Sequence, residues 1–156
     1  MTKSTRVKEI LVEPLKPFSS QKILREVFAD ADRYIKIMDP WVSDRSFDPL
    51  LQVKESVSIH FLTSHTGCKE KERRLIRFMK NLQVEKPRFN LRKAKGEEIH
   101  DRWIITEEHV WSLSQSIKDF GRKETIALIA PHSKQVKKKV EKFFDSLWKK
   151  GIKIIT

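Results

Sequence analysis

The sequence predicts an α/β fold in which one domain holds a mixed β-sheet flanked by helices on both faces. Strand and helix patterns alternate over the first half of the chain, a hairpin pattern follows, and a last amphipathic helix precedes a short apolar run. Alternation with helices favours parallel strands and a hairpin joins antiparallel ones, so the sheet should be mixed. The 156 residues suffice for a single domain with its own core.

The predicted strands are short runs rich in β-branched and aromatic residues, bounded by turn residues. Residues 1–18 are expected to form an N-terminal extension or an edge strand. The hairpin is expected around the turn Thr106-Glu107-Glu108-His109. We expect strands over residues 10–12, 34–38, 57–64, 88–93, 103–105, 110–113, 125–129 and 152–155.

The predicted helices show apolar residues at helical spacing. Ser19 or Ser20 is expected to cap the first helix, whose apolar face runs from Ile23 to Ala31. Ser133 is expected to cap the last helix, and Gly151 to end it. The expected inward positions are Phe47, Leu50 and Leu51 in 46–53, Leu75, Phe78, Met79 and Leu82 in 69–84, and Val136, Val140, Phe143, Phe144, Leu147 and Trp148 in the last helix.

The composition favours a polyanion as partner. Thirty-three Lys and Arg residues against 21 Asp and Glu give a net charge of +12, which suits nucleic acid first and an anionic membrane second. The alternative is a basic protein with scattered lysines. Cys68 is the only cysteine, so neither an internal disulfide nor a Cys-based metal site is expected. With no signal-peptide pattern and no apolar run of about 20 residues, we expect a soluble, cytoplasmic protein.

Two polar loops follow predicted strands at the sheet edge where α/β proteins usually bind ligands. Asp39 comes directly after the strand 34–38 and precedes Pro40 and Trp41. It is either a ligand-facing carboxylate or a turn residue beside a partly buried tryptophan. His65, in the loop after the strand 57–64, is either an anion-binding group or an ordinary loop histidine.

His100 and Arg102 are expected at the start of a strand, where a period of two places both side chains on one face. An imidazole beside a guanidinium suits phosphate, because one supplies a nucleophile or acid/base and the other charge-assisted hydrogen bonds. The alternative is an exposed strand face without a function.

The stretch from His100 to Glu124 resembles the signature of the phospholipase D superfamily. That signature is His-x-Lys-(x)4-Asp, then Gly-Ser-x-Asn after a short hairpin, then a Glu or Asn. His100 matches the catalytic histidine and Ser116 the serine, and Glu124 is the later acidic residue. The departures are Arg102 for lysine, Glu107 for aspartate, Gln115 for glycine and Lys118 for asparagine.

The resemblance implies metal-independent phosphodiester chemistry without a cofactor. In the family, one histidine attacks phosphorus to form a phosphohistidine, and a histidine from a second motif protonates the leaving group. This chain carries one motif, so a complete site implies a homodimer with His100 from each subunit.

We therefore predict a phosphodiesterase or nuclease acting on DNA or RNA. The alternative is a catalytically degenerate module of this family that binds nucleic acid, anionic lipid or a partner protein without turnover. Either protein could belong to a larger assembly. The expected catalytic residues are His100, Arg102, Ser116, Lys118 and Glu124, supported by Asp39 and Glu107, with nucleic-acid contacts from Lys71, Arg74, Arg77, Lys118, Arg122 and Lys123.

Overall fold

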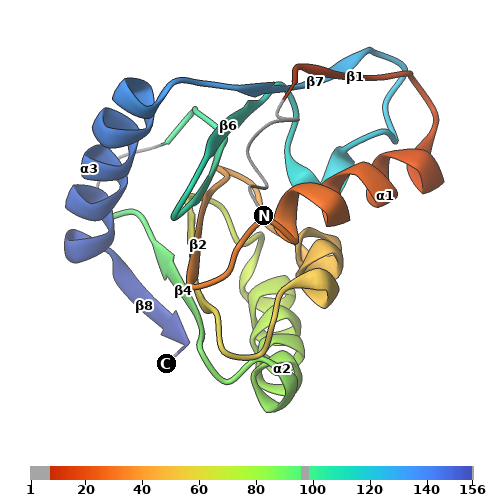
Figure 1. The fold of residues 1–156 in the computed structure, drawn as a ribbon. Coiled ribbons are helices and arrows are strands. Elements are labelled where there is room, and N and C mark those ends of the chain that lie inside the picture. Colours follow the sequence, from red (N-terminus) through yellow and green to blue (C-terminus); the bar gives the residue numbers. More distant parts are fainter. Residues whose placement is uncertain (1–7, 96–98, 156) are drawn as a thin grey trace.

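In the computed structural model, which describes residues 8–95 and 99–155, eight strands form one mixed sheet (Figure 1). The strand order is β1-β7-β6-β5-β2-β3-β4-β8. The strands are β1 (Ile10–Val12), β2 (Tyr34–Met38), β3 (Ser58–Thr63), β4 (Phe89–Lys93), β5 (Trp103–Thr106), β6 (Val110–Leu113), β7 (Ala127–Pro131) and β8 (Ile152–Ile155). The helices are α1 (Pro17–Phe28), α2 (Lys69–Glu85) and α3 (Lys134–Lys150), with 3-10 helices η2 (Asp44–Gln52) and η3 (Ile117–Asp119).

The parallel part of the sheet lies at its centre. β2, β3 and β4 are parallel neighbours, joined through η2 and α2, and every other pairing is antiparallel. Because β5 runs antiparallel to β2, with Trp103 opposite Met38, the start of β5 lies beside the end of β2. The loops after β2 and β3 and the segment before β5 therefore meet at one edge of the sheet.

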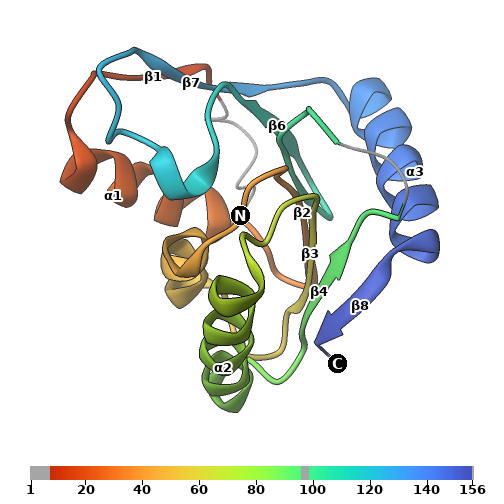
Figure 2. The same cartoon turned by 180° about the vertical axis from the view of Figure 1, so that it is seen from behind.

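Helices cover both faces of the sheet, as predicted (Figures 1 and 2). On one face, α1, η2 and α2 pack apolar side chains such as Phe28, Leu50 and Met79 onto Ile37 and Phe61. On the other, the core beneath α3 is built from Phe144 and, in the strands, Met38, Leu62, Ile105 and Val110. Burial on both faces accounts for the consecutive apolar residues Ile37-Met38 and Phe61-Leu62 near the ends of β2 and β3.

The first helix begins earlier than predicted. α1 starts at Pro17, a residue well suited to the first helical position because it needs no N–H partner there. Ser20 is therefore inside the helix and does not cap it. Its hydroxyl is buried and donates to the carbonyl of Phe120 at 2.9 Å. Gly121, with φ of 76°, leaves room for that contact, since a Cβ there would lie 2.1 Å from the Ser20 oxygen.

Three apolar residues that the sequence placed inward are exposed. Leu51 is 62% exposed because η2 has three residues per turn, which aligns Phe47 with Leu50 and turns Leu51 away. Phe143 is 49% exposed because its neighbour Phe144 takes the buried position of α3. Phe78 is 40% exposed, although one side of its ring stacks on Phe47 with centroids 6.0 Å apart.

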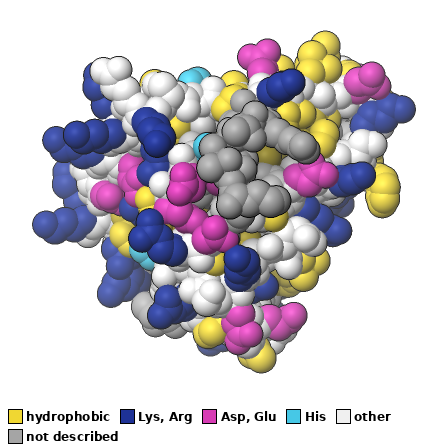
Figure 3. All heavy atoms as spheres, viewed as in Figure 1, with side chains coloured by type: hydrophobic (Ala, Val, Ile, Leu, Met, Phe, Trp, Pro, Cys, Tyr) yellow, Lys and Arg dark blue, Asp and Glu magenta, His cyan; other side chains and the backbone are white. Residues whose placement is uncertain are grey.

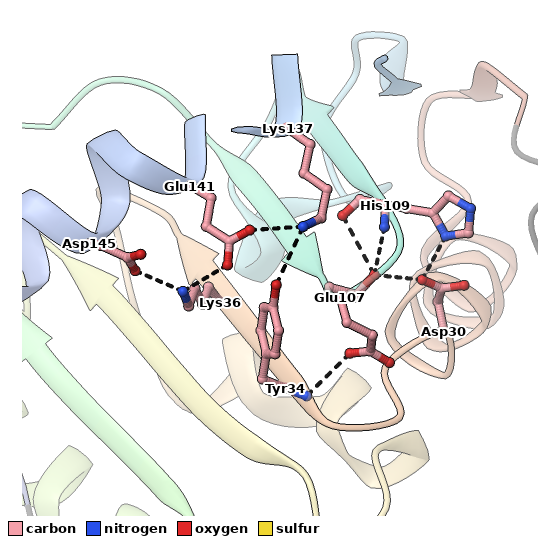
Figure 4. A network of polar contacts seen from close by, with 9 residues as sticks. Asp30, Tyr34, Lys36, Glu107, His109, Lys137, Glu141 and Asp145 are labelled. Atoms are coloured by element: carbon pink, nitrogen blue, oxygen red, sulfur yellow. Dashed lines mark hydrogen bonds and ion pairs between the residues drawn. The ribbon is translucent and has the colours of Figure 1, made fainter. Parts of the chain in front are cut away.

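A polar network that the sequence did not predict joins α3 to β2 (Figure 4). The Lys36 ammonium lies 2.8 Å from both Glu141 and Asp145, and Lys137 donates to Glu141 at 2.8 Å and to the Tyr34 hydroxyl at 3.3 Å. Burial raises the pKa of Tyr34, as does its hydrogen bond with Glu141. Burial alone lowers the pKa of Lys36, but hydrogen bonds with Asp145 and Glu141 outweigh it and raise the pKa.

Candidate active site

Residues from three distant parts of the chain meet at the sheet edge described above. Asp39 follows β2, Arg102 precedes β5, and Ser116 follows β6. The Arg102 Nε donates to the Ser116 Oγ at 3.0 Å and lies 4.0 Å from the Asp39 carboxylate. The Ile99 N–H donates to the Ser64 hydroxyl at 2.8 Å, which fixes the segment before β5 against the loop after β3. The structure thus brings Arg102 and Ser116 of the motif together with Asp39, which was predicted to support the site.

Asp39 is the buried centre of this cluster, only 1% exposed. Its carboxylate accepts the N–H of Ile117 at 2.8 Å and the N–H of Trp41 at 3.2 Å. Burial raises the pKa of Asp39 to about 6, against the lowering effects of the Ile117 N–H, the Ser116 hydroxyl, the Trp41 N–H and the Arg102 charge. Asp39 therefore holds the start of η3 in place.

The predicted strand geometry of His100 and Arg102 is wrong. β5 begins at Trp103, and both residues lie in the segment before it. Pairing with β2 stops there because β2 ends at Met38 and Pro40, which has no N–H, cannot extend the ladder, although the Arg102 carbonyl still accepts the Leu113 N–H of β6 at 3.0 Å. Instead of sharing a strand face, the two side chains differ in exposure: His100 is exposed, whereas the Arg102 side chain is 26% exposed and bound to Ser116.

Ser116 and Lys118 sit on either side of the Ile117 N–H that binds Asp39. Ser116 is 3% exposed, with its hydroxyl directed at Arg102. Lys118 lies on η3 and pairs with Asp119 at 2.9 Å. The two residues predicted to contact phosphate are thus placed differently, one inside the cluster and one at its rim.

A groove of about 660 Å³ adjoins the cluster, and Lys118 is one of the residues that line it. Lys71 and Arg74, both predicted to contact nucleic acid, line the same groove from α2. The sequence did not indicate Arg45 of η2 or the stacking of Trp41 on His65, whose ring centroids are 4.0 Å apart. The signal was available, since Trp41 and His65 follow neighbouring parallel strands.

The remaining predicted contact residues are dispersed. Arg77 on α2 and Lys123 after η3 are exposed outside the lining of this groove. Arg122 lines a different hollow beside Gln21 and Arg25 of α1. In the described part of the chain, Glu124, which was predicted to be catalytic, is exposed in the loop that leads to β7 and forms no hydrogen bond or ion pair with Arg102, Ser116 or Asp39.

Glu107, predicted to support the site, lies at the far end of β5 in the turn before β6 (Figure 4). Its carboxylate accepts the N–H of Tyr34 at 3.2 Å and the N–H of Asp32. Burial raises the pKa of Glu107, but these backbone hydrogen bonds outweigh it and hold the pKa below its usual value. Beside it, His109 contacts Asp30 at 2.8 Å. Glu107 therefore anchors the start of β2, away from the cluster.

The charge on the surface is spread over more than one face. Lys and Arg side chains gather over α3 on the left of Figure 3. In the part of the chain that the structure describes, no group of three His, Cys, Asp or Glu residues could hold a metal ion. None of the helices described in the structure is long and apolar enough to cross a bilayer.

Comparison with known proteins identifies the fold. No protein-family model and no curated protein matches the sequence. Among solved structures, Nuc from Salmonella typhimurium, a phospholipase D family member, matches 94% of this chain over 98% of its own, with a TM-score of 0.69 and 13% identity. NucT from Helicobacter pylori aligns with 94% of this chain, and the alignment covers 98% of NucT, with a TM-score of 0.63 and 14% identity.

A third similar structure is TrmBL2, described as an archaeal chromatin protein with a novel mode of DNA binding. It matches 94% of this chain but only 54% of its own length, with a TM-score of 0.60 and 17% identity. The chain has the phospholipase D-like fold. The resemblance noted in the sequence is confirmed at the level of the fold.

Proposed function

We propose that this chain is a nuclease-like phosphodiesterase that cleaves nucleic acid through His100. The observation that carries the proposal is the convergence of Arg102, Ser116 and Asp39 at 3.0 and 4.0 Å, two residues along the chain from an exposed histidine. A phosphate beside this cluster gains charge-assisted hydrogen bonds from the guanidinium, whose remaining N–H groups form a planar fork. The Ser116 hydroxyl accepts the Arg102 Nε–H and so helps to orient the guanidinium.

The proposed reaction has two steps. A ring nitrogen of His100 attacks phosphorus and forms a P–N bond while the bond to the leaving oxygen breaks. That oxygen takes a proton from the histidine of a second copy. Water then attacks phosphorus, its proton returns to that histidine, and the P–N bond breaks to free His100.

The second histidine comes, in this proposal, from a homodimer. Each copy contributes one His100, and a two-fold axis places the two histidines on opposite sides of the phosphorus. Asp39 acts as a positioning residue because it fixes the N–H of Ile117 and lies beside Arg102. Arg102 then meets the phosphate in a defined orientation.

A cleavage assay tests the proposal. The purified chain is incubated with single- and double-stranded DNA and RNA in EDTA, beside His100→Ala and, as a matched control, His132→Ala, which removes another exposed histidine. We expect cleavage that survives EDTA, persists in His132→Ala and is lost in His100→Ala. Absence of cleavage on every polymer and on a model diester would overturn the proposal, and a strictly monomeric active protein would overturn the shared site.

Nucleic-acid binding without turnover is the second candidate. Two contacts favour it, because they occupy groups that the phosphodiesterase proposal assigns to the reacting phosphate. The Arg102 Nε already donates to Ser116, and Lys118 is already paired with Asp119. TrmBL2, which has the same fold, is described as DNA-binding. In the same assay this candidate predicts a retarded but intact polymer, both with the unaltered chain and with His100→Ala.

A further inference from the structure

We propose that the groove beside the cluster is a binding site for single-stranded nucleic acid, in which an unpaired base stacks on Trp41. The inference rests on the proposed function, because it takes nucleic acid as the ligand. It adds that the ligand is single-stranded and that Trp41 is the residue that distinguishes a single strand from a duplex. Phosphates on either side of the stacked base would lie against Arg45, Lys71 and Arg74, which line the groove.

Trp41 is held in place although it is 47% exposed. The backbone N–H of Trp41 donates to the Asp39 carboxylate at 3.2 Å, and the backbone also forms a parallel bridge with His65. The Val42 N–H donates to the His65 carbonyl at 3.2 Å. The His65 ring covers one side of the indole, with an interplanar angle of 21°. The indole is thus fixed before a ligand arrives, and little side-chain freedom is lost when a base stacks on it.

Positive charge surrounds the indole. Arg45 comes from η2, and Lys71 and Arg74 come from α2, so two elements present cations to one groove. In the described ranges, 8–95 and 99–155, none of these three cations forms an ion pair. Two carboxylates also line the groove, but Asp119 is paired with Lys118, which leaves Asp44 as the acidic exception. The balance favours a polyanion.

The combination of an aromatic platform with cations on two sides selects an unpaired strand. In a duplex both faces of each base are stacked inside the helix, whereas an unpaired base offers a face to an aromatic ring. The volume of about 660 Å³ is in the range of nucleotide-sized ligand sites. Because Trp41 is bonded to Asp39 and Lys118 lines the groove, a nucleotide held here lies next to the proposed scissile phosphate.

Binding measurements with matched ligands and variants test this site. A fluorescein-labelled single strand, the same sequence as a duplex, and the same strand with abasic sites are titrated against the full chain, Trp41→Ala and Trp41→Phe. Phe143→Ala is the control, since Phe143 is similarly exposed, at 49%, but lies on α3 across the sheet. Circular dichroism of each variant checks its fold.

We expect the single strand to bind more tightly than the duplex and the abasic strand. Trp41→Ala should weaken single-strand binding by about ten-fold, Trp41→Phe by less, and Phe143→Ala not at all. The abasic strand should bind the unaltered chain and Trp41→Ala equally. Equal affinity for base-containing and abasic strands would overturn the proposal, as would failure to bind any single strand.

The outcomes separate this inference from the proposed chemistry. Base-dependent binding that falls in Trp41→Ala, without any cleavage, supports the groove and rejects the phosphodiesterase. Cleavage that needs His100 but shows the same affinity in Trp41→Ala supports the enzyme and rejects the stacking site.

Discussion

Asp39 and Glu107 are carboxylates at opposite ends of the paired strands β2 and β5, and they differ in burial and in the charge beside them. Glu107 accepts backbone N–H groups at the start of β2, which hold its pKa below the usual value. Asp39 also accepts backbone N–H groups, from Ile117 and Trp41, but it is buried beside Arg102, and burial raises its pKa to about 6. A carboxyl whose pKa is shifted by burial next to a specific charge is typical of functional sites. A carboxylate that is bound mainly by backbone N–H groups is typical of structural sites. This contrast supports the proposal that the chemistry takes place at the Asp39 end.

The largest effect is expected at the functional end, from His100→Ala. Loss of the proposed nucleophile should lower the cleavage rate by about 10³-fold or more, because the P–N bond of the proposed reaction forms at His100. Glu107→Gln, at the other end, should leave the rate of the folded protein within a few-fold. Single-turnover cleavage of a labelled strand measures both. Comparable losses in the two variants would remove the distinction between the ends.

Arg102→Ala should lower cleavage by about 10²-fold, since it removes the cation that meets the phosphate. Arg102→Lys should retain more activity than Arg102→Ala, because the charge is kept while the planar fork and the bond to Ser116 are lost. The ratio of kcat/KM values for the two variants checks this order. An Arg102→Ala variant as active as the unaltered chain would show that the cluster does not bind the phosphate.

The stability of the two ends should respond to pH with opposite signs. The folded state keeps the proton on Asp39 between its ordinary pKa of 3.8 and about 6, so stability falls as pH rises through that window. The shift in pKa corresponds to about 3 kcal/mol. The free energy of unfolding of Asp39→Asn, relative to that of the unaltered chain, should therefore rise by this amount between about pH 4 and pH 7. Urea unfolding at several pH values measures this. A constant difference between the two proteins would contradict it.

Glu107 should behave in the opposite way. Its pKa is lowered in the folded state, so its contribution to stability is present above the usual pKa of 4.5 and is lost as pH falls through the folded value. Glu107→Gln should therefore be the less stable protein at neutral pH, and the difference should narrow in acid. The same urea series reports it, and a difference that widens in acid would be the contrary result.

The smallest expected change is in nucleic-acid affinity, after charge reversal on the basic surfaces. Charge reversal of Lys71 and Arg74, which line the groove, should weaken binding by about ten-fold and reduce the salt dependence of log K by about two. Reversal of the exposed Lys139 and Lys142 on α3 should change binding less. Titrations at several salt concentrations distinguish the faces. An equal or larger loss from the α3 variant would move the interface to that helix.

Much of the fold follows from the apolar pattern, because burial imposes it directly. The strand at 34–38 and the cap at Ser133, whose hydroxyl accepts the Val136 N–H, are as predicted. Leu51 shows the limit, since a 3-10 helix and an α-helix place it on different faces and the short pattern does not distinguish them.

The candidate site is less predictable because it depends on strand register. Trp41 and His65 stack because Met38 is level with Leu62, and each ring lies three residues beyond that pair. Asp39 meets Ile117 through the pairing of β2, β5 and β6. Neither register can be read from local sequence. The motif suggests that Arg102 lies near Ser116 and the sequence predicts Asp39 as a supporting residue, but only the fold shows how Asp39 reaches the pair.

The central claim is that the Asp39 end supports covalent chemistry at His100. The most direct measurement is mass spectrometry of the chain quenched at alkaline pH during turnover of a short single-stranded oligonucleotide. We predict a nucleotide joined through phosphorus to the peptide that contains His100, present in the unaltered chain and absent from His100→Ala. Turnover without this adduct, or an adduct on another residue, would contradict the account.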